Sequence, residues 1–180
     1  TERWTEEEIK DVIERQGGYW NGWTGQERTV YYAQVADHDL DIALEWLAQL
    51  GFHATLPADK VDKERDVIFE ERFGHYGWLI NTLNELGFGY ELDRGIRQAL
   101  FPESSLGQRV GGEDDSLEVV DRAALLAYYQ KHYTPDNAVL ILVGNITPDE
   151  VVAKVLTLLG DLEGGDPPAR PETPAAVDGG

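Results

Sequence analysis

The sequence predicts an α+β fold in which an antiparallel sheet is flanked by helices. Residues 19–24 and 29–35 are rich in aromatic and β-branched side chains on either side of a short turn, which is typical of a hairpin. Helical spacing of apolar residues precedes and follows this hairpin. The resulting order of helix, hairpin, helices, strand and helix does not alternate as a doubly wound sheet does. Three strands are few for this much helix, so one or two strands are expected to be missing.

The first predicted elements are a helix and the hairpin. Thr5-Glu6-Glu7-Glu8 has the pattern of a capping box, and Gly17-Gly18 is a stop signal for the helix that follows it. Residues 19–24 are predicted to form the first strand. Residues 25–28 form the turn and residues 29–35 form the second strand.

Helices dominate the middle of the predicted fold. Asp39 is expected to cap a helix that stops at Gly51, and a long acidic helix follows Pro57. Residues 78–101 are predicted to be helical with breaks at two glycines, and residues 102–115 to be a loop. The apolar face of the helix after Asp39 is predicted to consist of Leu40, Ala43, Leu44, Leu47 and Leu50.

The C-terminal part is predicted to contain a helix over 116–133, a turn and a buried strand over 138–143. Thr147, Pro148 and Glu150 then signal the start of the last helix, which ends at Gly160. Its buried face is predicted to consist of Val151, Val152, Val155, Leu158 and Leu159. We therefore expect one domain over residues 1–163 and a Pro/Gly-rich linker over 164–180.

Composition restricts the possible partners and chemistry. Fifteen basic against 34 acidic residues give a net charge of −19, which argues against nucleic acid and anionic membranes as partners. No apolar run reaches the roughly 18 residues of a membrane span, so we expect a soluble protein without membrane insertion. The absence of Cys excludes disulfides and thiolate catalysis within the chain. Composition does not distinguish a cytoplasmic from a periplasmic location.

Two carboxylates stand at positions of the acidic helix where apolar residues are usual. Glu64 and Glu71 are seven residues apart, so they lie about 20° apart around a helix axis, on the side of Val67 and Ile68. Periodicity by itself favours a helix exposed on that side, with Glu64 paired to a neighbouring lysine and Glu71 in solvent. The alternative is a metal, a cation or a catalytic duty that compensates them.

Other candidate sites are weaker. His75 follows Glu71 at a spacing that can place two metal ligands on one helix face, but Gly74 weakens the helix there, and an ordinary histidine is favoured. No nucleophile elbow or phosphate-binding loop is present. The hairpin aromatics, which can be core residues or a binding face, are Tyr19, Trp20, Trp23, Tyr31 and Tyr32.

Three segments resemble the M16 family of zinc metallopeptidases, which includes pitrilysin, insulinase and mitochondrial processing peptidase. Residues 17–32, GGYWNGWT followed by TVYY, are similar to the family's "GG…N-A-aromatic-T…T-V-Y-Y" segment. Residues 63–71 resemble its "KERxVIxxE" helix. Residues 128–145 resemble its "YYxxHYTPDN…VGN" segment. The resemblance runs over about residues 5–162.

The resemblance implies roles for named residues. Glu71 aligns with the family's third zinc ligand, and Glu64 with a supporting carboxylate. Asn21 aligns with the asparagine of an edge strand that pairs with peptide substrate, with Gly22 in place of the usual Ala. The predicted substrate-binding residues are Asn21, Gly22, Trp23 and Thr24.

The family's H-x-x-E-H motif, with two His ligands and the general-base Glu, does not occur in the sequence. We expect that motif, and the first strands of the sheet, upstream of Thr1. The resemblance thus implies part of a zinc-dependent endopeptidase that hydrolyses peptides or unfolded segments with metal-activated water. A second M16-like half or subunit is the implied partner, and the chain alone is expected to be inactive and without stoichiometric zinc.

Two alternatives stay open at this point. The chain can be a non-catalytic M16-like subunit or scaffold domain that binds peptide or pairs with an active partner. It can also be an independent acidic interaction domain, which failure to form an M16-like sheet would favour.

Overall fold

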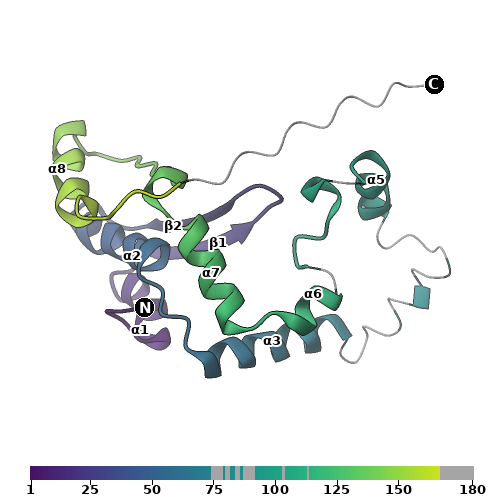
Figure 1. Cartoon of the computed structure of the whole chain (residues 1–180). Coiled ribbons are helices and arrows are strands. Elements are labelled where there is room, and N and C mark those ends of the chain that lie inside the picture. Colours follow the sequence, from purple (N-terminus) through teal and green to yellow (C-terminus); the bar gives the residue numbers. More distant parts are fainter. Residues whose placement is uncertain are drawn as a thin grey trace. The chain divides into compact units, whose positions relative to one another are not determined.

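The computed structural model describes residues 1–73, 79, 82–83, 86, 92–102, 104–112 and 114–166 (Figure 1). These residues form two compact units. The first lies within 1–23, 29–56 and 125–166, and the second within 24–28 and 57–124. The elements are α1 (Glu6–Glu14), β1 (Tyr19–Thr24), β2 (Thr29–Gln34), η1 (Asp37–Asp39), α2 (Leu40–Phe52), α3 (Ala58–Phe73), α5 (Leu92–Leu100), η2 (Ser105–Gly107), α6 (Asp114–Val119), α7 (Arg122–His132), η3 (Pro135–Asn137) and α8 (Pro148–Leu159).

Helix α1 begins and ends where the sequence predicts. The Glu8 N–H donates to Thr5 Oγ1 at 3.3 Å, and Glu8 Oε2 accepts the Thr5 N–H at 2.9 Å, which completes the capping box. The hydrogen bond from the Thr5 backbone holds the pKa of Glu8 below its ordinary value. Beyond the helix, Gly17 has φ +70°, a conformation that glycine adopts without steric cost.

The hairpin forms an antiparallel sheet of β1 and β2, as predicted. Its turn is closed by a hydrogen bond from the Gly25 N–H to the Arg28 carbonyl at 2.8 Å. The α+β prediction is therefore confirmed, with a sheet of two strands in the part of the chain that the structure describes.

A core of α1, α2 and one face of the hairpin holds the first unit together. Its buried residues are Ile9, Ile13, Ala43 and Trp46, against which Trp20, Ala33 and Val35 pack from the hairpin. Both indoles also donate to α1. Trp46 Nε1 lies 2.7 Å from the Ile9 carbonyl oxygen, and Trp20 Nε1 lies 2.9 Å from that of Lys10. These bonds fix β1 against the helices.

Helix α2 runs to Phe52, so Gly51 lies inside the helix and is not its stop. No side-chain hydrogen bond from Asp39 caps it. The predicted apolar face contains two of the buried residues, Ala43 and Leu44. Trp46 and Ala48 are also buried and belong to a neighbouring stripe that the periodicity did not select.

Two predictions for the C-terminal part are wrong. Residues 138–143 do not form a strand, and Val139 and Val143 are 87% and 94% exposed. An apolar run becomes a buried strand only when neighbouring strands pair with it, and no described strand does so. Helix α8 has the predicted capping box, but none of its residues is buried, because no described element covers the predicted apolar face completely.

The predicted helix over 116–133 is divided into α6 and α7. Val120 and Asp121 interrupt it, and Asp121 Oδ1 accepts the Ala124 N–H at 2.8 Å as a new N-terminal cap. Much of the predicted helix over 78–101 lies outside the described residues. Its main described part is α5. Most of the predicted linker also lies outside them, and the boundary after residue 163 stays a prediction.

Replacing Gly18 or Gly51 with alanine is expected to change the stability of the protein in opposite directions. A Cβ at Gly18 would lie 2.7 Å from the Gln34 carbonyl oxygen and 2.9 Å from side-chain atoms of Ile13 and Val35, whereas nothing lies within 4 Å of one at Gly51. We expect Gly18→Ala to lower the free energy of unfolding by about 1–3 kcal/mol through overpacking. Gly51→Ala, inside α2, should raise it by about 0.5–1 kcal/mol. Urea denaturation followed by circular dichroism measures both, and equal effects of the two substitutions would contradict the packing around Gly18.

Candidate functional site

Asn21 lies on β1 and uses both ends of its carboxamide. Its Nδ2 donates to the Tyr19 hydroxyl at 2.9 Å, and its Oδ1 accepts the Gly22 N–H at 2.7 Å. The hydrogen bond from Asn21, and a weaker one from Tyr32, hold the pKa of Tyr19 below its ordinary value. Because the Tyr32 hydroxyl is the donor to Tyr19, the pKa of Tyr32 is raised. The carboxamide is thus held in one orientation on the sheet.

The hairpin register determines which backbone groups of β1 face outward. Residues 25 and 28 are hydrogen-bonded across the turn, and in an antiparallel pair such residues alternate with residues whose N–H and C=O point away from the partner. Trp20, Gly22 and Thr24 therefore direct their backbone groups to the outer edge of β1. The acceptance of the Gly22 N–H by Asn21 Oδ1, rather than by β2, agrees with this alternation. Asn21 thus occupies one donor of the outer edge.

Glycine at position 22 fits a close contact between the strands. An added Cβ would lie 3.0 Å from Tyr31 Cδ1 and 3.3 Å from the Val30 carbonyl oxygen. The Tyr31 ring is partly buried, and its hydroxyl lies 3.2 Å from that of Tyr133. Burial, with a smaller contribution from Tyr133, raises the pKa of Tyr31. The ring of Tyr31 therefore fills the space that a side chain at position 22 would need.

The acidic helix of the sequence prediction is α3, in the second unit. Glu64 is exposed, and Val67 and Ile68 on the same side are exposed as well. The predicted ion pair of Glu64 with Lys60 or Lys63 stays a prediction. Glu71 lies on α3 seven residues later, and its side chain is outside the described part.

The described residues do not form a zinc site by themselves. Within the described ranges, no group of three His, Cys, Asp or Glu side chains can hold a metal ion. His38 Nδ1 lies 3.5 Å from Asp37 Oδ1, and His38 Nε2 lies 3.2 Å from Asp39 Oδ2. The His132 ring stacks on Tyr128 with 4.1 Å between ring centroids. His75 lies outside the described residues.

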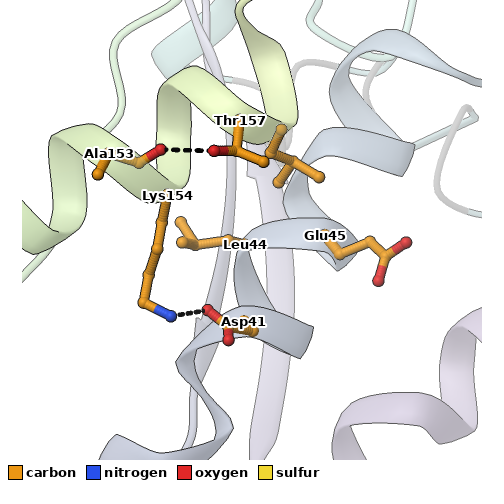
Figure 2. Close-up of a pocket in the computed structure, with 7 residues that line it drawn as sticks. Asp41, Leu44, Glu45, Ala153, Lys154 and Thr157 are labelled. Atoms are coloured by element: carbon orange, nitrogen blue, oxygen red, sulfur yellow. Dashed lines mark hydrogen bonds and ion pairs between the residues drawn. The ribbon is translucent and has the colours of Figure 1, made fainter.

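A hollow of about 420 Å³ lies between α2 and α8 (Figure 2). Asp41 and Lys154 form an ion pair across it, and Leu44 and Leu158 are among its apolar lining residues. The ion pair joins two helices and leaves neither charge aimed at a ligand. This hollow is a packing feature of the first unit.

Tyr19 was missed as a partner of Asn21, although its position two residues away on one strand face could have indicated the contact. Asn21, Gly22 and Trp23 lie in the first unit, and Thr24 in the second with Glu64 and Glu71. Each helix in the described part of the chain is too short or too polar to span a membrane.

Comparison with family models gives two matches from one family. Residues 1–75 match the model described as insulinase, peptidase family M16, and residues 120–180 match the M16 inactive domain.

Curated relatives agree with these matches. An uncharacterised zinc protease of Mycobacterium leprae is 31% identical over 82% of the chain. The beta subunit of the mitochondrial-processing peptidase of Blastocladiella emersonii is 29% identical over 97%. The chain spans 31% and 36% of these two proteins, about a third of their length.

Solved structures show the same fold. A protease from Helicobacter pylori matches 91% of the chain with a TM-score of 0.71 and 21% identity, over 38% of its own length. The first half of the periplasmic protease PqqL from Escherichia coli matches 96% with a TM-score of 0.72 and 24% identity, over 37% of its length. With both family models and these relatives in agreement, the chain belongs to the M16 family of metallopeptidases.

Proposed function

We propose that this chain is the peptide-holding part of a zinc-dependent endopeptidase, and that β1 holds the substrate by strand addition. The observation that supports this most directly is the outer edge of β1, where Asn21 Oδ1 occupies the Gly22 N–H. An extended peptide needs that donor for its own carbonyl. The Asn21 carboxamide then keeps the edge hydrogen-bonded until a peptide replaces it.

The role of Glu71 as a metal ligand, with Glu64 as its support, rests on the M16 resemblance and on their common helix. Relatives named zinc proteases support zinc in the complete enzyme. The exposed side of α3 around Glu64, Val67 and Ile68 supports a further element packed there in that enzyme. The general base and the two His ligands are assigned to no residue of this chain.

A non-catalytic M16 domain is the second candidate. It is favoured by the match of residues 120–180 to the model described as the inactive domain. In that case β1 still binds an extended peptide, while hydrolysis belongs to a partner subunit or second half. The two candidates share the peptide site and differ in metal content.

Zinc analysis of the natural full-length protein separates the two candidates. The endopeptidase proposal predicts stoichiometric zinc in the wild type, its loss in Glu71→Gln and about 10- to 100-fold weaker zinc affinity in Glu64→Gln. Glu70→Gln is the matched control, because Glu70 adjoins Glu71 but lies about 100° away around α3. Atomic absorption after dialysis gives the zinc content. Unchanged zinc in Glu71→Gln would refute its ligand role, and no zinc in the wild type would support the second candidate.

Tyrosine titration tests the orientation of the Asn21 carboxamide. Two hydrogen bonds stabilise the Tyr19 phenolate, and the one from Asn21 lowers the pKa of Tyr19 more than the one from Tyr32 does. Asn21→Ala removes it, so the pKa of Tyr19 should rise toward its ordinary value. Tyr32→Phe removes the smaller one and should raise it less. Carbon-13 NMR of labelled tyrosine follows the titration, and an unchanged pKa of Tyr19 in Asn21→Ala would show that the contact is absent in solution.

Peptide binding tests the edge of β1. Asn21→Ala also removes the group that competes with peptide for the Gly22 N–H. Whether the peptide dissociation constant falls or rises in this variant therefore shows what the carboxamide does. A carboxamide that only protects the edge predicts equal or tighter binding. A carboxamide that also bonds the peptide predicts binding weaker by about fivefold to tenfold, the value of one hydrogen bond. Fluorescence anisotropy with a labelled extended peptide measures this, and no binding by the wild-type protein would contradict the proposal.

A further inference from the structure

The chain contains one Asn-Gly dipeptide, Asn21-Gly22, and it lies within β1. The other asparagines precede larger residues: Asn81 precedes Thr, Asn84 Glu, Asn137 Ala and Asn145 Ile. An asparagine loses ammonia most readily before glycine, because glycine has no side chain that hinders approach of its backbone nitrogen to the carboxamide. The sequence therefore distinguishes Asn21 from every other asparagine of the chain.

The structure holds the two reacting groups side by side. Gly22 N lies 2.7 Å from Asn21 Oδ1, the oxygen bonded to the carboxamide carbon Cγ that the nitrogen would attack. Two groups that are already in contact need little of the entropy that is otherwise lost in bringing them together. The folded strand therefore favours the encounter of Gly22 N with the carboxamide.

Pairing with β2 does not engage the reacting nitrogen. A backbone N–H that donates to a neighbouring strand is fixed in the sheet and directed away from its own side chains. The hairpin register instead directs the Gly22 N–H to the outer edge of β1. Asn21 and Gly22 are both exposed, so water reaches the carboxamide and the nitrogen.

The Tyr19 hydroxyl lies where ammonia would leave. It accepts a hydrogen bond from Asn21 Nδ2 at 2.9 Å. When Nδ2 separates from Cγ it gains a lone pair and needs a proton, and a hydroxyl within hydrogen-bond distance is placed to donate one. The hydrogen bond from Asn21 also holds the pKa of Tyr19 below its ordinary value, which makes this hydroxyl a stronger acid than a free tyrosine.

We propose that Asn21-Gly22 is a site of spontaneous deamidation, at which the chain modifies its own strand β1. Gly22 N loses its proton to water and bonds to Asn21 Cγ, the Cγ–Nδ2 bond breaks, and ammonia leaves with a proton from Tyr19. Water returns a proton to the tyrosinate and then opens the five-membered imide at either of its two carbonyl carbons. The net reaction converts asparagine and water into aspartate or isoaspartate at position 21, and ammonia.

The two products change the edge of β1 in different ways. Aspartate keeps an acceptor beside the Gly22 N–H but makes it a carboxylate, which binds that donor more strongly than a neutral carboxamide does. Isoaspartate adds one carbon atom to the backbone, which displaces the strand after position 21. If peptide binds along β1 as proposed above, both products weaken that binding, and a bound peptide that occupies the Gly22 N–H slows the reaction.

Mass spectrometry of the full-length protein tests the reaction. The protein is kept in mildly alkaline buffer made with oxygen-18 water, sampled over time and digested with trypsin. Cleavage after Arg15 and Arg28 gives the peptide 16–28, in which Asn21 is the only asparagine. We expect the label to enter this peptide at least as fast as it enters a synthetic peptide of the same sequence. Asn137 and Asn145, in the same digest, should be labelled at least about tenfold more slowly than Asn21.

Substitutions test the two structural contributions. Gly22→Ala should slow labelling of Asn21 by about tenfold or more, because its methyl group hinders the nitrogen. Tyr19→Phe keeps the ring without the hydroxyl and should slow labelling by about threefold to tenfold, since water replaces the lost proton donor incompletely. Tyr128→Phe, at an exposed tyrosine of α7, is the matched control and should leave the rate unchanged. In urea, wild type and Tyr19→Phe should react equally, because the contact exists only in the folded chain.

Peptide binding tests the consequence for the strand. A saturating concentration of an extended peptide should slow labelling of Asn21 in the wild-type protein. Asn21→Asp carries the aspartate product from the start and should bind the peptide about fivefold more weakly, because its carboxylate competes more strongly for the Gly22 N–H. Fluorescence anisotropy measures this affinity.

The outcomes distinguish this inference from the proposed function. Slower labelling of Asn21 in the folded protein than in the synthetic peptide would overturn the deamidation site. Equal rates in folded wild type and Tyr19→Phe would overturn the role of Tyr19. Labelling at the expected rate in a protein that binds no peptide would support the site and overturn the peptide-holding function. Peptide binding without labelling would do the reverse.

Discussion

The anchoring of the hairpin to α1 and α2 by two tryptophans is the constraint on which the first unit depends. Trp46 and Trp20 lie 5.4 Å apart between ring centroids, and each donates its indole N–H to a carbonyl of α1. Without these bonds a two-stranded hairpin is at best marginally stable in water. Because one face of β1 is fixed in this way, its other face and its outer edge are presented in a defined direction, with Asn21 among the exposed residues.

The same register that buries Trp20 gives the edge of β1 its properties. In β1, the residues on the core side of the strand are also those whose backbone N–H and C=O groups point away from β2. The packing of Trp20 on the core therefore leaves the outer edge of β1 open for hydrogen bonding. An unpaired edge is a risk for unwanted pairing. The contact of Asn21 Oδ1 with the Gly22 N–H reduces that risk, and Tyr19 holds the carboxamide in place. Protection of the edge and recognition of a peptide can therefore share the same three residues.

In the described part of the chain, apolar side chains on two segments are exposed to solvent. The run over 138–143 is exposed and unpaired, and the side of α3 with Glu64, Val67 and Ile68 is open. Apolar patches of this kind mark interaction surfaces in soluble proteins. Since the chain spans about a third of its curated relatives, these surfaces agree with the proposal that the active protein has further elements or a second M16 half.

Local signals in the sequence determined the starts of α1 and α8, the hairpin and the M16 membership. The capping boxes at Thr5 and Thr147 and the β-rich runs around residues 25–28 act over a few residues, so they can be recognised without a fold. Tertiary structure alone decided what depends on distant neighbours. The run over 138–143 has strand composition but no partner strand, and Trp46 is buried by α1 and Trp20 rather than by its own helical pattern. The side of β1 that meets solvent was decided in the same way, because pairing with β2 and the packing of Trp20 on the core fix it.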